Sequence, residues 1–186
     1  MSLGTALLFL ALPLGAAPNS PESSDSALDA VASRLPAYAA LASTDIQVPA
    51  PSIALGASSK AYLCWKLQLT GAHGRQVRTV MERLRSIRDA AAGLRDTLSR
   101  DLLLHASGAG GPALRERILA QDASLDSLRV SYENLLQAGL RGGLLKVSER
   151  GLLREGGSVT ARLRKDDYTM VHDESQPGCP PTRPPR

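Results

Sequence analysis

The fold is decided by one stretch, Arg75 to His105, which reads RQVRTVMERLRSIRDAAAGLRDTLSRDLLLH. Its apolar residues recur every three or four positions over about eight turns, which predicts one amphipathic helix with a single apolar stripe. Charged and polar residues fill most of the remaining positions, as expected of a side that faces solvent. The stripe consists of Val77, Met81, Leu84, Ile87, Ala91, Leu94, Leu98 and Leu102.

A second helix is predicted after a short glycine-rich break. Residues Ser107 to Gly111 read SGAGG, and Pro112 suits the first turn of a new helix, where a backbone N–H would have no partner in any case. Helical spacing then continues to about Ala138. Because the break is short, the two helices are predicted to be antiparallel neighbours in a long hairpin. The second stripe consists of Leu114, Ile118, Leu125, Leu128, Tyr132 and Leu135.

The flanking segments complete the predicted fold. Residues Ser23 to Ala42 have helical spacing, and Pro36 is expected to kink or end that helix. Residues 44–59 contain two prolines and a glycine, which is typical of a connection. Residues 60–69 alternate with a period of two, which admits a strand, but the flanking helices favour a short helix, which is our prediction. Leucines between Leu140 and Leu153 predict a last, shorter helix.

Composition favours the same fold class. Aromatic residues make up only 3% of the chain. The apolar content is mainly Leu, Ala and Val; Leu and Ala favour helices, whereas strands favour β-branched and aromatic residues. We therefore predict an all-α fold, a small bundle of about four helices over residues 18–157 with the long central hairpin. Residues 158–186 are predicted to form an extended, flexible tail that is basic and rich in proline.

The first residues resemble a secretory signal peptide. Leu3 to Ala17 reads LGTALLFLALPLGAA, which is uncharged and shorter than the ~20 residues that a membrane span needs. The helix breaker Pro13 lies near the end of this segment, small residues follow Pro13, and a polar stretch comes next. We predict a signal peptide over residues 1–17 and a secreted protein without a stable span after its removal. The segment lacks a basic start and a clean cleavage site, so a buried helix or an uncleaved anchor is the alternative.

The two cysteines are predicted to form a disulfide. Cys64 and Cys179 would be an isolated pair in an oxidising compartment, where such pairs are usually bonded. The bond would tie the tail to the segment around Trp65. Two unrelated thiols, or a tail cysteine that pairs with another molecule, are the alternatives. His73, His105 and His172 lie too far apart in sequence for zinc-ligand spacing with these cysteines, and no metal or cofactor is expected.

Charge and motifs narrow the function classes. The formal net charge is +4, with Arg in large excess over Lys, which is compatible with weak binding to polyanions. No run of five basic residues and no aromatic interleaving is present, so a nucleic-acid partner is not predicted. The sequence contains no phosphate-binding loop, HExxH, GxSxG, CxxC or EF-hand pattern, so an enzyme is not predicted either.

In overall pattern the chain resembles the long-chain four-helix cytokine and hormone group. A signal-like start and helices without an active site carry the resemblance, together with the connection VPAPSIALGAS (residues 48–58) that leads to Trp65 before the long helix. The resemblance implies a secreted signalling ligand that binds a protein receptor. Exposed arginines such as Arg78, Arg85 and Arg88 would then be receptor contacts, although a solubilising face is the favoured explanation for them. Pro36 and the short Gly139–Gly143 connection depart from the family pattern.

A second hypothesis is an intracellular scaffold or coiled-coil subunit of a protein complex. Val77, Leu84, Ala91 and Leu98 are spaced by seven residues, and Ile118, Leu125 and Tyr132 keep the same step. Such heptads can pair helices between proteins, although an ordinary helical bundle has them as well. Lipid binding by amphipathic helices is a weaker third possibility.

Overall fold

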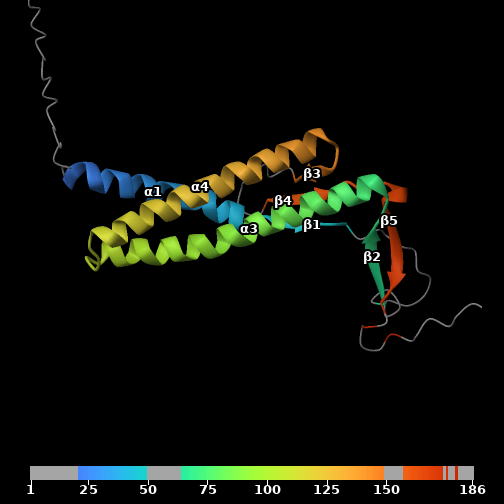
Figure 1. Cartoon of the computed structure of the whole chain (residues 1–186), viewed down its shortest axis with the longest axis horizontal. Coiled ribbons are helices and arrows are strands. Elements are labelled where there is room, and N and C mark those ends of the chain that lie inside the picture. The colour runs from blue at the N-terminus through green and yellow to red at the C-terminus, as the bar shows by residue number, and fades with distance from the viewer. Residues whose placement is uncertain (1–20, 50–63, 149–156, 174, 176–178, 180–186) are drawn as a thin grey trace, which may run out of the picture.

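The computed structural model describes residues 21–49, 64–148, 157–173, 175 and 179. Three long helices form a rod, a small three-stranded sheet lies alongside one half of it, and a two-stranded sheet projects from the end of that half (Figure 1). The helices are α1 (Pro21–Ala42), α3 (Gly71–Ala106) and α4 (Pro112–Arg141). The strands are β1 (Asp45–Gln47), β2 (Trp65–Leu69), β3 (Leu145–Val147), β4 (Ser158–Ala161) and β5 (Tyr168–His172), and a short 3-10 helix, η1 (Lys165–Asp167), precedes β5.

The α3–α4 hairpin confirms the central prediction. The two helices run antiparallel along the whole rod, joined by the glycine-rich break at one end (Figure 1). Gly108 and Gly110 have φ values of 75° and 128°, a region that glycine enters without steric cost. Pro112 begins α4, as expected of a proline in a first helical turn.

Helix α1 covers one side of the hairpin. Its side chains Val31, Tyr38 and Leu41 are fully buried against α3 and α4. The helix does not end near Pro36, because it continues to Ala42. Pro36 and the preceding-turn residue Ala32 are both exposed, so the carbonyl that loses its intrahelical partner can be hydrated.

A three-stranded sheet closes the same side of the rod beyond α1. Strand β4 lies in its centre, parallel to β1 and antiparallel to β3. Ile46, Leu145 and Val159, one from each strand, are buried in the common core. The last helix that we predicted from Leu140 onward is therefore wrong over Leu145–Val147, which form β3; residues 149–156 lie outside the described part of the chain.

The other sheet is an antiparallel ribbon of β2 and β5 that projects steeply from the end of the rod (Figure 1). Trp65 stands opposite His172 in the register, and Leu69 opposite Tyr168. The preferred helix over residues 60–69 is wrong for Trp65–Leu69; the alternation of side chains was the correct signal there. The ribbon carries the predicted disulfide, since Cys64 and Cys179 are bonded with their Cα atoms 5.5 Å apart.

The fold class is consequently α+β, and the prediction of an all-α bundle of four helices is wrong. The described residues contain three α-helices, five strands and the 3-10 helix η1. Segments 158–161 and 168–172, which we assigned to an extended tail, pair in the two sheets. The predicted signal segment 1–17 and most of the 44–59 connection lie outside the described residues.

Candidate protein-binding site

The hairpin carries two rows of apolar contacts, and the first row is completely covered. It contains the heptad residues of the sequence analysis, and each has an exposed fraction of 0%. Helix α1 and the three-stranded sheet lie over them. We call this row the covered seam. It consists of Val77, Leu84, Ala91 and Leu98 on α3 and Ile118, Leu125 and Tyr132 on α4.

The second row lies between α3 and α4 on the side of the hairpin away from the covered seam. Asp101 of α3 shows which residues of the two helices lie level with one another in this row. The carboxylate of Asp101 accepts hydrogen bonds from Arg117 at 2.7 and 2.8 Å and from Gln121 at 2.9 Å. Residues seven positions apart lie on the same face of a helix. Because α3 and α4 are antiparallel, a contact between them recurs seven residues earlier on α3 and seven residues later on α4. Leu94 is therefore level with Leu128, and Ile87 with Leu135.

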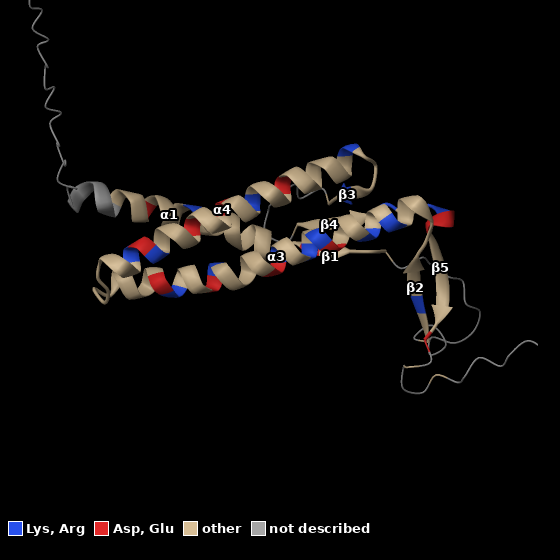
Figure 2. Ribbon diagram, viewed as in Figure 1, with Lys and Arg blue, Asp and Glu red and all other residues tan. Residues whose placement is uncertain are grey.

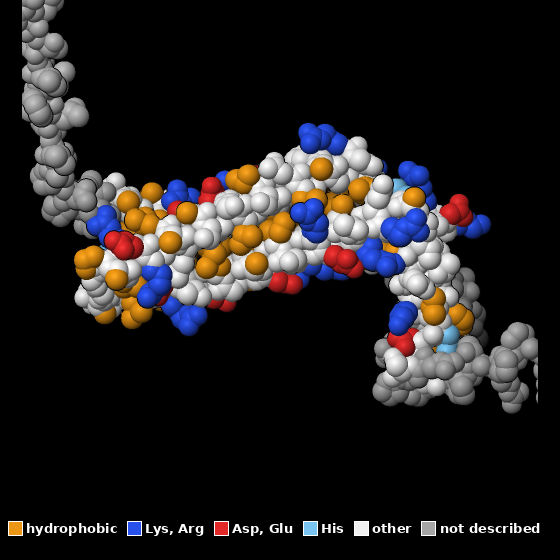
Figure 3. Space-filling view, viewed as in Figure 1, with side chains coloured by type: hydrophobic (Ala, Val, Ile, Leu, Met, Phe, Trp, Pro, Cys, Tyr) orange, Lys and Arg blue, Asp and Glu red, His pale blue; other side chains and the backbone are white. Residues whose placement is uncertain are grey.

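The residues of this row pack against the core but stay partly exposed. A Cβ placed on Gly139 would lie 3.5 Å from Val80, which extends the row to the end of α4. Figure 3 shows an apolar band between α3 and α4 on the face turned to the viewer. We call this row the open seam. It consists of Val80, Ile87, Leu94, Leu128 and Leu135.

Most of the positions that flank the open seam carry small side chains, and few of them are charged. The next heptad row outward on α3 contains Gln76, Arg83, Ala90 and Thr97, and the matching row on α4 contains Ser124, Ser131 and Ala138. Arg83 is the single charged residue in these two rows. Helix faces that only meet water usually carry many more charges. Small flanking side chains also let another helix approach the apolar row closely.

A hollow lies at the ribbon end of the open seam. Its volume is about 490 Å³, and Val80 and Leu144 form its apolar wall. Arg75 lies on its rim. With Arg83, this arginine makes the α3 half of the seam basic, so a ligand of this surface would gain from a carboxylate at that end.

The three arginines proposed as receptor contacts lie on another side of α3. Arg85 donates a hydrogen bond to the carbonyl of Ile46 at 3.1 Å, and Arg88 to that of Thr44 at 3.3 Å. Arg78 donates to the carbonyl of Leu69. These bonds fasten the end of α1, β1 and β2 to α3. Figure 2 shows how the basic residues gather along this half of α3. The structure brings the three arginines together but does not place them on the open seam.

Two buried polar clusters fix the positions of the helices. Asp122 of α4 accepts hydrogen bonds from Arg34 at 3.0 Å and from the Tyr38 hydroxyl at 2.8 Å, both on α1. Burial raises the pKa of the Tyr38 phenol, and its bond to Asp122 adds to that shift. The bonds from Arg117 and Gln121 hold the pKa of Asp101 below its ordinary range, against the opposing effect of burial. Sequence patterns did not reveal these clusters, because their members lie far apart in the chain.

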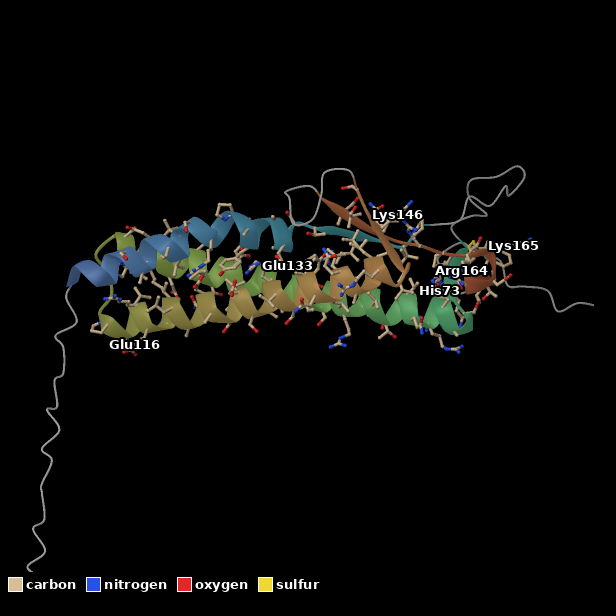
Figure 4. All side chains as sticks on the ribbon, turned by 90° about the horizontal axis from the view of Figure 1, so that it is seen from above. His73, Glu116, Glu133, Lys146, Arg164 and Lys165 are labelled. Carbon is tan, nitrogen blue, oxygen red and sulfur yellow. A yellow bond between two sulfur atoms is a disulfide. The ribbon has the colours of Figure 1, made fainter. Side chains whose placement is uncertain are left out.

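A third cluster joins the ribbon to the rod (Figure 4). His73 of α3 and Asp167 of η1 are joined by a 2.7 Å hydrogen bond between Nδ1 and Oδ2. The backbone N–H of Thr70 donates to the Asp167 carbonyl at 2.7 Å. Burial opposes ionisation of the Asp167 carboxyl, but the Arg164 N–H and His73 hold its pKa below the ordinary value. A Cβ on Gly74 would overlap the Asp167 carbonyl, so glycine permits this close contact.

Within the described ranges, no group of three His, Cys, Asp or Glu side chains is arranged to hold a metal ion. None of the helices in that part of the chain is long and apolar enough to cross a membrane. Comparisons with protein-family models, with curated proteins and with solved structures found no significant match. The resemblance to the cytokine and hormone group therefore stays a prediction, and its expected bundle of four helices is corrected above.

Proposed function

We propose that the protein is a non-enzymatic ligand of the secretory pathway that acts by binding a protein receptor through the open seam. The observation that carries this proposal is the half-buried apolar row between α3 and α4, flanked by positions that are mostly small and rarely charged. From Val80 to Leu94 the seam is about 21 Å long at 1.5 Å per residue, the length of about four helical turns. An apolar row of this length suits the apolar face of an amphipathic helix.

The disulfide supports the extracellular part of the proposal. Bonds between isolated cysteines persist in oxidising compartments and are rare in the cytosol. The Cys64–Cys179 bond agrees with secretion, as does the signal-like sequence of residues 1–17. The alternative, an intracellular scaffold subunit, would use the same seam to bind a helix of a neighbouring subunit, but the bond does not favour it.

Secretion is tested by expressing the full chain in mammalian cells and sequencing the N-terminus of the product. We expect a product in the medium that has lost Met1 and the apolar segment that follows it. Protein that stays in the cytosol with Met1 intact would refute the extracellular proposal and favour the scaffold. Mass analysis without reductant should also find no free thiol on the secreted chain.

Receptor binding through the open seam is tested with substitutions at exposed flanking positions, which leave the core unchanged. Ala90→Glu and Ser131→Glu place carboxylates beside the apolar row, one on each helix. Ala123→Glu is the matched control, since Ala123 is exposed on α4 but belongs to neither the seam nor its flanks. We expect saturable binding of the purified protein to cells, which the first two variants lose and the control keeps.

Equal binding by all three variants would show that the seam is not the docking surface. Light scattering on the purified protein tests whether a second copy of this chain occupies the open seam. A dimer that the two flanking variants dissociate, and the control does not, would mean that a second copy of this chain covers the seam, and the receptor proposal would then fail.

A further inference from the structure

The described residues divide into a basic and an acidic end. The ribbon end comprises residues 45–49, 64–88, 141–148 and 157–173, and it carries eleven Lys or Arg against five Asp or Glu, a net charge of +6. The rest of the described chain, residues 21–44 and 89–140, carries six against ten, a net charge of −4. Because α3 alone spans about 54 Å, this separation gives the rod a strong field at one end. The formal net charge of the whole chain, +4, does not show this separation of charge.

A hollow at the basic end gathers three of these cations. It lies where the ribbon meets α3, has a volume of about 570 Å³, and is lined by Lys66, Arg78 and Arg85 with Glu82 as the one carboxylate. The other described residues of the lining are mainly apolar, and none of them is aromatic.

The two arginines of this hollow are held in place and keep donors to spare. Each guanidinium gives one N–H to a backbone carbonyl, Arg78 to Leu69 and Arg85 to Ile46. Across the described residues, neither has a carboxylate within ion-pair distance, unlike Arg34, Arg117 and Arg129 elsewhere in the rod. A guanidinium has five N–H donors, so several stay available on each. Fixing the side chain beforehand lowers the entropy cost of binding an anion.

The chemistry of the hollow selects among anionic ligands. Arginine forks match the paired oxygens of sulfate, phosphate and carboxylate groups. Proteins that bind single-stranded nucleic acid add aromatic side chains on which the bases stack, and the described residues that line this hollow include none. The surrounding charge favours a chain with many anionic groups over a single small anion.

We infer that the ribbon end binds a sulfated polysaccharide chain, with Lys66, Arg78 and Arg85 at the centre of the site. The choice of a sulfated sugar rests on the proposed extracellular function, since polymers of that kind lie outside cells. The open seam stays free for a protein on another side of α3, so both ligands can be bound together.

The test is the affinity of the purified, oxidised full chain for heparin as the probe. We compare the double variant Lys66→Gln/Arg78→Gln with Arg100→Gln/Arg115→Gln, which removes the same charge from the acidic end. The first pair should weaken binding by about fivefold for each lost cation, or about 25-fold in all, and the second pair should have little effect. Thermal unfolding of each variant checks that the fold is kept. Lys66→Gln alone is the second variant, because the Lys66 side chain is 64% exposed and its ion pair with Asp173 is long, at 3.6 Å.

Three results would overturn the inference. Equal losses in the two double variants would mean that heparin responds only to net charge. No loss with the first pair and with Lys66→Gln alone would place the anion elsewhere. Binding of single-stranded DNA as tightly as heparin, with the same sensitivity to Lys66 and Arg78, would assign the site to nucleic acid. Because this assay uses purified protein, its outcome is independent of whether cells secrete the chain or whether the open seam binds a receptor.

Discussion

Shortening Leu98 and shortening Leu94 to alanine should have very different effects on stability, although both leucines lie on the apolar stripe of α3. Leu98 belongs to the covered seam and has an exposed fraction of 0%. Leu94, four residues earlier, belongs to the open seam and is half-buried. The same chemical change therefore measures whether the second seam is open in the isolated protein.

The expected magnitudes follow from burial. Leu98→Ala removes buried carbon atoms and leaves an enclosed cavity, so it should lower the free energy of unfolding by about 3–4 kcal/mol. Leu94→Ala leaves no enclosed cavity, because solvent reaches the site. It loses only part of the transfer free energy of three carbon atoms, at about 0.8 kcal/mol for each when fully buried, which gives about 1 kcal/mol.

Urea unfolding followed by circular dichroism measures both values. With a slope of about 2 kcal/mol per molar urea, the two midpoints should differ by roughly 1 M. Equal and large losses would refute the reasoning, because they would mean that another part of the chain, or a second copy, covers Leu94. Repeating the titration at several protein concentrations separates those two explanations, since only the second depends on concentration.

Three further predictions concern the ribbon and the polar clusters. Replacing Cys64 and Cys179 together by serine should cost up to about 5 kcal/mol by the chain-entropy relation for a separation of 115 residues, and amide exchange should rise first in β2 and β5. Gly74→Ala should destabilise the fold by about 2 kcal/mol, because the new Cβ would overlap η1. The control Gly93→Ala, whose Cβ would meet open space, should stabilise α3 by about 0.5–1 kcal/mol. A stabilising Gly74→Ala would contradict the docking of η1 against α3. The ionised Asp101 carboxylate stabilises the fold, because its pKa is lower in the folded than in the unfolded chain. This stabilisation is complete above the ordinary pKa of 3.8 and is lost as the pH falls through the lower folded value. Asp101→Asn should therefore make the midpoint of thermal unfolding less sensitive to pH below about 4.

Sequence reasoning was most successful where structure is local. The spacing from Val77 to Leu98, the glycine-rich break and Pro112 each act through residues a few positions away, and the hairpin that they predict is confirmed. The disulfide was also predictable, because a chain with two cysteines has one possible intramolecular pair.

The strands were missed because they are short and their partners are distant. Asp45 pairs with Ser158, and Trp65 with His172, so neither pairing leaves a local signal. Strands of three to five residues also give too few positions for a period of two to be distinguished from a helical turn. In residues 65–69 the alternation is visible, but the neighbouring helical segments favour a helix there.

The candidate site was predictable only in part. Ile87, Leu94, Leu128 and Leu135 were identified as members of apolar stripes, but the sequence alone does not say which members another element covers. That depends on where α1 packs, which Tyr38 and its bond to Asp122 help to determine. The bonds of Arg85 and Arg88 to backbone carbonyls were likewise invisible, because any exposed helix can carry such arginines.

The pairing of β1 with β4 also sets an order of folding. Asp45 and Ser158 are separated by the entire hairpin, so this parallel contact closes a long loop and comes at a high entropic cost until the hairpin has formed. On the ribosome, α3 and α4 can form while residues from Ser158 onward are still unmade. Both sheets, and the disulfide at the ribbon, must wait for that segment. A chain stalled before it would present a folded helical hairpin with Ile46 lacking its strand partner, a state that chaperones can recognise by its exposed apolar surface.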